Sequence, residues 1–232
     1  MNHSFLMQIA TDSTAVSEDF KEVAIWQAVK DAGSTPMGAI VLIVLAIMSV
    51  YAIYIFVERF LALRRASQID PNFLTNVKQM LVDGKIDDAK NLCARTNTPS
   101  ARMIEKGISR LGKHVDVVSS AIDNTGKLEI SKLEQRLSFL ATASGAAPMI
   151  GFLGTTLGMV QTFNEMKNLD SLQLDTIAPG IMTAMVTTVA GLIVGIIAYM
   201  GYNYLVAKIT TVIYRMENDA MEFMDLLHKP GN

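Results

Sequence analysis

The sequence predicts an all-α integral membrane protein with three transmembrane helices, two of them very long and extending into a helical cytoplasmic domain. Only 18% of its 232 residues are charged, against about 25% in a typical soluble domain. The charges are missing in three blocks of 22, 28 and 32 residues, which are residues 36–57, 137–164 and 176–207. About 20 apolar residues cross a bilayer as a helix, so each block is long enough to span it.

The distribution of Lys and Arg predicts the orientation of these spans. Residues 58–136 carry 14 of the 20 basic residues, and positive charge is retained on the cytoplasmic side of a membrane. The N-terminus is therefore expected outside and the C-terminus inside. This assigns residues 1–35 and the loop 165–175 to the extracytoplasmic side, and residues 58–136 and a C-terminal helix over 208–232 to the cytoplasm.

Interface anchors are expected at both ends of the first span. Arg59, Arg64 and Arg65 follow it directly, and Trp26 precedes it within a helical stripe of apolar residues. The segment 1–35 is interpreted as containing an amphipathic helix on the outer surface, with a short soluble helix burying one Trp as the alternative. No Lys or Arg occurs in the first 12 residues, so the first span is expected to stay as an anchor rather than be removed as a secretory signal.

Helix boundaries can be predicted between the first two spans. A helix is expected to begin at Asp70-Pro71, where an N-cap residue precedes a proline, and to end at Gly84. Two more helices are expected over 86–94 and 100–111, separated by Asn97-Thr98-Pro99.

The two long helices are predicted from the absence of helix breakers. From Val115 to Phe163 one helix of about 73 Å could run from the cytoplasm through the second span. The third span likewise continues without a breaker from Gly201 to Leu227. Both helices should therefore project beyond the membrane.

Several classes of function find no support in the sequence. The single Cys93 cannot form an internal disulfide, and the three His residues are far apart, so no metal-ligand spacing appears. No basic patch interleaved with aromatic residues indicates nucleic-acid binding. An enzyme is disfavoured because no nucleophile with a base, phosphate loop or pair of acids occurs; Glu165, Asp170 and Asp175 are explained by hydration of a loop. No cofactor is expected.

The second and third spans carry small and hydroxylated residues on defined helix faces. None of the three blocks contains Asp, Glu, Lys, Arg or His, so a proton carrier would have to come from elsewhere. Such faces permit close helix packing, which is their commoner use, or line a conduction path. In the second span they comprise Gly151, Gly154 and Gly158 with Thr155 and Thr162, and in the third Ala184, Thr188, Gly191 and Gly195 with Thr183 and Thr187.

Two segments resemble the MotA/TolQ/ExbB family of ion-channel proteins. They are APMIGFLGTTLGMV at 147–160, with Pro148, and IAPGI at 177–181, with Pro179 and Gly180. The resemblance extends to the three spans, the outside N-terminus and the helical cytoplasmic block. The outside extension of about 35 residues is more similar to the ExbB branch than to the short-tailed TolQ branch.

This resemblance implies a motor subunit in the inner membrane of a bacterium. In ExbB-like proteins a homopentamer surrounds a dimer of single-span ExbD-like partners, whose membrane Asp carries the ion, and the assembly drives a TonB-like protein for import across the outer membrane. The alternatives are a TolQ-like role in envelope integrity, a sodium-driven variant and a membrane scaffold that passes no ions. A neighbouring gene for a single-span protein with a membrane Asp would favour the motor.

The resemblance also assigns the pore residues. Thr155 and Thr188 match the two pore-facing threonines of the family, and Thr183 stands where many ExbB proteins have a glutamate. The chain would then depend on the partner's acid alone. Thr187-Thr188 resembles the paired threonines of sodium-driven flagellar relatives, and hydroxyl oxygens suit a hard cation. The proton remains the expected ion, with Na⁺ as the alternative.

Overall fold

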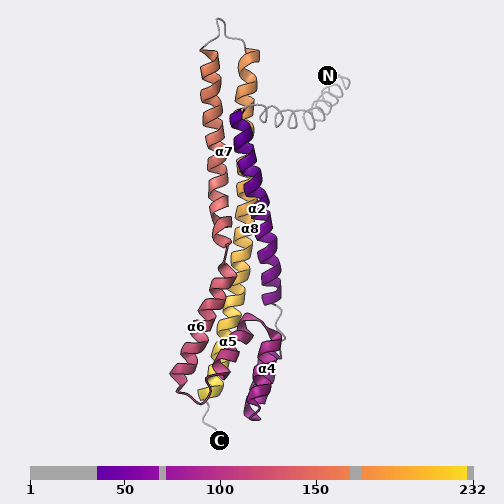
Figure 1. Cartoon of the computed structure of the whole chain (residues 1–232), viewed down its shortest axis with the longest axis vertical. Coiled ribbons are helices and arrows are strands. Elements are labelled where there is room, and N and C mark those ends of the chain that lie inside the picture. Colours follow the sequence, from indigo (N-terminus) through magenta and orange to yellow (C-terminus); the bar gives the residue numbers. More distant parts are fainter. Residues whose placement is uncertain (1–35, 68–71, 168–173, 229–232) are drawn as a thin grey trace, which may run out of the picture. The chain divides into compact units, whose positions relative to one another are not determined.

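The computed structural model describes residues 36–67, 72–167 and 174–228, and all regular structure within them is helical. Figure 1 traces the helices in sequence order, from α2 in indigo to α8 in yellow. Their bounds are α2 Pro36–Ala66, α3 Phe73–Val82, α4 Ile86–Thr96, α5 Pro99–Ile108, α6 Val115–Glu134, α7 Leu137–Met166 and α8 Leu174–His228. The predicted surface helix with Trp26 and the predicted start at Asp70-Pro71 lie outside the described residues.

Three helical stretches are long and apolar enough to cross a membrane, as predicted. They are Pro36–Ala66, Val115–Asn164 and Gly180–Leu227. The third belongs to a single helix of 55 residues, α8, which confirms the prediction that no breaker interrupts it. The all-helical class and the three apolar helices of the prediction are therefore confirmed.

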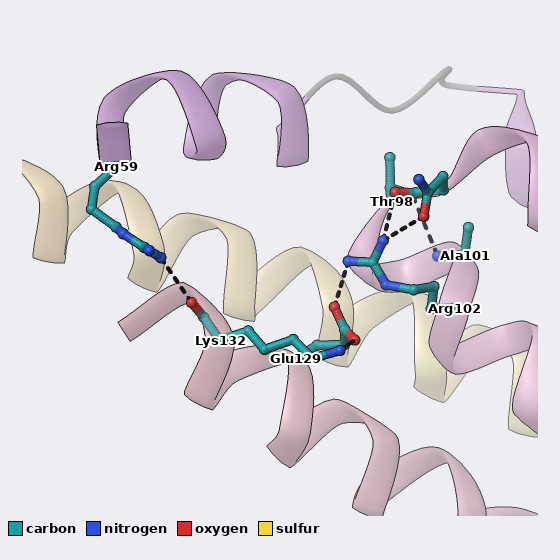
Figure 2. Close-up of polar contacts among 7 residues, drawn as sticks. Arg59, Thr98, Ala101, Arg102, Glu129 and Lys132 are labelled. Carbon is teal, nitrogen blue, oxygen red and sulfur yellow. Dashed lines mark hydrogen bonds and ion pairs between the residues drawn. The ribbon is translucent and has the colours of Figure 1, made fainter. Parts of the chain in front are cut away.

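The prediction of one unbroken helix from Val115 to Phe163 is wrong, because a turn at Gln135 and Arg136 separates α6 from α7. Arg136 adopts a φ of 68°, a left-handed conformation that costs an L-residue about 1 kcal/mol. Arg59 of α2 stabilises the break: its Nη1 donates to the carbonyl of Lys132 at 3.0 Å, one of the last carbonyls of α6 that a helix end leaves unpaired. Figure 2 shows this contact. Glu58 pairs with Arg136 at 2.7 Å.

The chain forms two compact units, described here separately. The first contains residues up to Ala52 together with Thr142–Tyr199, and the second contains Ile53–Ala141 together with residues from Met200 onward. The core of the second unit joins α3 to α6 with the end of α8 and buries Ile104, Ile122 and Phe223. Gly107 permits this packing, since a Cβ there would lie 2.8 Å from Ile122 Cδ1 and 2.9 Å from Phe223 Cε1.

Local sequence signals set the ends of the short helices. Gly84 follows α3 with a φ of 76°, as expected of the predicted stop. Asn97 closes α4 in the left-handed conformation, Thr98 accepts a hydrogen bond from the Ala101 N–H at 3.4 Å, and Pro99 is the first residue of α5. These are the C-cap, N-cap and N1 preferences of the three residue types.

One buried carboxylate ties α6 to the α4–α5 turn. Glu129, 3% exposed, accepts hydrogen bonds from Arg102 and, at 2.7 Å, from Lys132. Arg102 also donates to the backbone and side-chain oxygens of Asn97, both at 2.7 Å (Figure 2). Burial raises the pKa of Glu129, but the hydrogen bonds and charges of Arg102 and Lys132 outweigh it, so the pKa lies below its ordinary value.

Candidate functional site

In the first unit, α7 and α8 approach each other through glycines. A Cβ on Gly151 would lie 2.7 Å from the Thr187 carbonyl oxygen, and a Cβ on Gly191 would lie 2.6 Å from the Ala147 carbonyl oxygen. Gly195 faces the ring of Pro148, whose Cγ would be 2.6 Å from an added Cβ. Because the obstructing atoms at the first two sites are backbone, only glycine allows the two helices to lie this close.

The same face continues along α7 through Gly154 and Gly158. A Cβ on Gly154 would meet the Thr187 side chain at 2.6 Å and Val41 of α2 at 3.1 Å, while one on Gly158 would lie 3.0 Å from the Ala184 Cβ. Near the start of α8, Gly180 lies against Thr162; the side chain of Pro179 is outside the described residues. The small-residue faces of the two helices thus pack on one another within a single chain.

Thr155 and Thr188 meet at this interface and form a hydroxyl pair. Their Oγ1 atoms hydrogen-bond each other. Thr155 Oγ1 also lies 3.0 Å from the Ala184 carbonyl oxygen, and Thr188 Oγ1 lies 3.2 Å from that of Gly151. Both side chains are partly exposed. A hydroxyl has one proton and two lone pairs, so this pair retains acceptor capacity for water or a cation.

Thr183 and Thr187 occupy a different environment from this pair. Thr187 is 1% exposed, and its hydroxyl donates to the Ala184 carbonyl oxygen at 2.7 Å. The Gly151 carbonyl oxygen lies 3.3 Å from the same hydroxyl. Thr183 is 6% exposed, and both residues line a cavity of about 30 Å³, enough for about one water molecule. The structure therefore brings Thr155 and Thr188 together at an accessible edge and encloses the other two threonines between helices.

The expected interface anchors also differ from one another. Arg64 and Arg65 are exposed on α2, as side chains directed to lipid headgroups would be. Arg59 is 9% exposed and its guanidinium binds the end of α6, so in this chain it serves a structural contact rather than reaching outward. This contact could not be predicted from the sequence, because the Lys132 carbonyl is left unpaired only where α6 ends.

Comparison with known proteins identifies the family. The model of the MotA/TolQ/ExbB proton channel family matches residues 95–218, which include the end of α4, α5, α6, α7 and the interface of α7 with α8. The chain belongs to this family. Its similarity to the family confirms the resemblance found in the sequence.

Relatives of this MotA/TolQ/ExbB family member carry both TolQ and ExbB names. The Tol-Pal system protein TolQ of Pseudomonas aeruginosa is 34% identical over 132 residues, covering 53% of this chain and 57% of TolQ. An ExbB homolog of Methanothermobacter thermautotrophicus is 26% identical over 182 residues, covering 78% and 64%. The biopolymer transport protein ExbB of Aquifex aeolicus is 33% identical over 99 residues, covering 42% and 67%. The chain thus spans less than two thirds of the first two.

The polar groups of this site are neutral. The four threonines supply hydroxyl oxygens, Gln161 beside Thr183 and Thr187 supplies an amide, and neither 137–164 nor 176–207 contains an acid. Sequence reasoning missed that the carbonyls of Gly151 and Ala184 belong to the same cluster. Each carbonyl oxygen lies within hydrogen-bonding distance of two or more threonine hydroxyls. The only available signal was the placement of Gly151 and Ala184 on the small-residue faces.

Proposed function

We propose that this chain is the ion-conducting subunit of a membrane motor that uses the proton-motive force. With a dimer of single-span ExbD-like partners it energises a TonB-like protein for import across the outer membrane. Family membership supports this assignment. The observation that carries it is the partly exposed Thr155–Thr188 hydroxyl pair, which places polar oxygens within the charge-free, largely apolar segments 137–164 and 176–207.

The proposed assembly is a homopentamer with the partner dimer in its central pore. The glycine faces of α7 and α8 are occupied within the chain, so contacts between copies must use other faces. Both helices expose large apolar side chains away from that interface, such as Met149, Val160 and Met185. Neighbouring copies and lipid would share this surface, since apolar surface is stable against either.

The proposed setting is the bacterial inner membrane, with the N-terminus periplasmic and the C-terminus cytoplasmic. The excess of Lys and Arg in residues 58–136 supports this orientation. The helical domain of the second unit would then lie in the cytoplasm, and the short loop between α7 and α8 would lie in the periplasm.

The proposed ion is a proton carried by a membrane Asp of the partner. An acid in an apolar pore can cycle between protonated and ionised states as it meets water on each side, and this chain offers none within its spans. Thr155 and Thr188 would hydrate and orient that acid through their oxygens. In the sodium-driven alternative the hydroxyls would act as cation ligands; Thr187, being buried and hydrogen-bonded within the chain, would need to turn outward to join them.

A TolQ-like role in envelope integrity is the second candidate. It is favoured by the TolQ relatives of Pseudomonas aeruginosa and Haemophilus influenzae, which are 34% and 36% identical over their matched residues. The motor chemistry would be the same, and only the protein driven by it would differ. A scaffold without conduction is the third alternative, and it would not require hydroxyls paired at one depth.

Replacement of Thr155 and of Thr188 by Val tests the proposal. Val keeps the shape of Thr and removes the hydroxyl. We expect each variant to reach normal membrane levels, to assemble, and to lose partner-dependent, energy-dependent uptake by about tenfold, the effect of one hydrogen bond of about 1.5 kcal/mol.

The matched control is Thr156→Val, since Thr156 is exposed on α7 next to Thr155. Its hydroxyl donates to the Leu153 carbonyl of the same helix at 2.9 Å. The control variant should transport normally. Normal uptake in both Thr155→Val and Thr188→Val would assign these threonines to packing alone and remove the observation on which the proposal rests.

A further inference from the structure

A groove of about 350 Å³ lies between α2 and α8 within the second unit. Contacts between the helices pair Phe56 with Gly201, Phe60 with Tyr204, and Ser67 with Arg215. Residue numbers rise together in these pairs, so the two helices run in the same direction here. The charge-free blocks of the two helices end at Val57 and Ala207, and in this register the two ends are about five residues, or about 7.5 Å, apart along the helices.

Aromatic rings lie near these two ends. Phe56 and Phe60 stack with centroids 6.1 Å apart, and Tyr204 lies 6.4 Å from the first and 6.1 Å from the second. Tyrosine gathers where the apolar core of a bilayer meets its headgroups, and Tyr204 lies three residues before the end of the charge-free block at Ala207. The mouth of the groove is therefore at headgroup depth.

Three cations follow the aromatic rings along the groove: Arg64, Lys208 and Arg215. Lys208 Nζ lies 5.8 Å from the centroid of the Tyr204 ring, and Arg215 donates weakly to Ser67 at 3.4 Å. None of the described residues lining the groove is acidic. In the described part of the chain no ion pair engages these cations, although Asp219, one turn beyond, senses the charge of Arg215.

We propose that this groove binds the headgroup of an anionic phospholipid from the adjoining membrane leaflet. The phosphate would be held by Arg64 and Lys208, with the Thr211 hydroxyl among the lining groups. The acyl chains would leave the groove along its apolar wall of Phe60, Leu63 and Leu205. Free inorganic phosphate would make no contact with that apolar wall. The combination of cations with aromatic and apolar lining residues therefore identifies a lipid.

The proposal rests on insertion of the apolar blocks in a membrane and is independent of ion conduction. The test is lipid retention by the full-length chain, purified in mild detergent and analysed by native mass spectrometry after addition of phosphatidylglycerol or phosphatidylcholine. The wild type should retain phosphatidylglycerol preferentially. Each basic residue beside an anionic lipid is worth about fivefold in affinity, so Arg64→Gln with Lys208→Gln should weaken retention by about 25-fold.

Lys113→Gln with Lys127→Gln is the matched control, because both lysines are exposed in the second unit and neither lines the groove. It should keep wild-type retention. A charge-preserving variant, Arg64→Lys with Lys208→Arg, should keep phosphatidylglycerol bound and guards against a loss caused by misfolding. A second readout is the rise in melting temperature that phosphatidylglycerol should give the wild type but not the Arg64/Lys208 double Gln variant.

Three results would overturn the proposal. Equal retention of the two lipids by the wild type would show that the cations do not select an anionic headgroup. Equal loss in the Lys113/Lys127 control and in the Arg64/Lys208 double Gln variant would show a diffuse surface charge effect rather than a site. If inorganic phosphate raised the melting temperature as much as phosphatidylglycerol did, the ligand would be the free anion and the lipid assignment would be wrong.

Discussion

The polar side chains of this protein lie in two different environments, one partly exposed and one buried. The hydroxyls of Thr155 and Thr188 remain partly exposed and pair with each other, whereas that of Thr187 is consumed inside the helix interface. Cys93 is also internal: burial and the nearby charge of Glu105 raise the pKa of its thiol to about 12, so it stays protonated and unreactive at neutral pH. Residue type alone did not distinguish these environments.

At the residue scale, Glu129→Gln should destabilise the second unit by about 2 kcal/mol at neutral pH, the value of hydrogen bonds to a charged group. The change removes the buried negative charge that Arg102 and Lys132 contact, while Arg102 keeps its hydrogen bonds to Asn97. Because the folded pKa of Glu129 is depressed, its contribution is present above the ordinary carboxyl pKa and is lost as pH falls toward the folded value.

Unfolding free energies of the solubilised protein at several pH values measure this effect. The difference between wild type and Glu129→Gln should shrink as pH drops below about 4.5, the ordinary value for the group. Glu134→Gln is the control, since Glu134 is exposed at the end of the same helix; it should change stability little. A pH-independent difference would refute the assigned role of the carboxylate.

At the scale of elements, the helices confirm some sequence predictions and correct others. Charge-free blocks located the three apolar helices, and Gly84 and Asn97-Thr98-Pro99 located helix ends, because these signals are local. The break at Gln135 and Arg136 contains neither Gly nor Pro, and it depends on Arg59 and Glu58, more than 70 residues away. Likewise, the residue pattern of α8 places Thr183, Thr187 and Thr188 on adjoining faces of the helix. It does not show which of these faces α7 covers.

Gly191→Ala should separate α7 from α8. The new methyl group would lie 2.6 Å from the Ala147 carbonyl oxygen and 2.9 Å from Gly151 Cα, and backbone atoms cannot rotate away. We expect a loss of about 1–3 kcal/mol, seen as a lower melting temperature in detergent and a reduced level in the membrane.

Gly145→Ala on α7 is the control for this helix interface, because no heavy atom lies within 4 Å of its added Cβ. It should be neutral or slightly stabilising, since Ala favours helix over Gly. Equal melting temperatures for Gly191→Ala and the wild type would mean that the two helices do not pack as closely as described.

At the scale of the whole molecule, the proposed motor is divided between chains. In the proposed assembly this chain would contribute apolar helices, paired hydroxyls and a helical domain, while the titrating acid would belong to a partner. The proposed dependence on a partner follows from the absence of Asp, Glu, Lys, Arg and His in residues 137–164 and 176–207. Under this proposal a conducting assembly contains both proteins.

Ion flux in liposomes tests this central claim most directly. The chain would be reconstituted with its co-purifying single-span partner, and internal pH would be followed with a dye after a proton gradient is imposed, with and without sodium. We predict proton uptake only when both chains are present, independent of sodium. An assembled complex that passes neither protons under this gradient nor sodium under its own would contradict the claim.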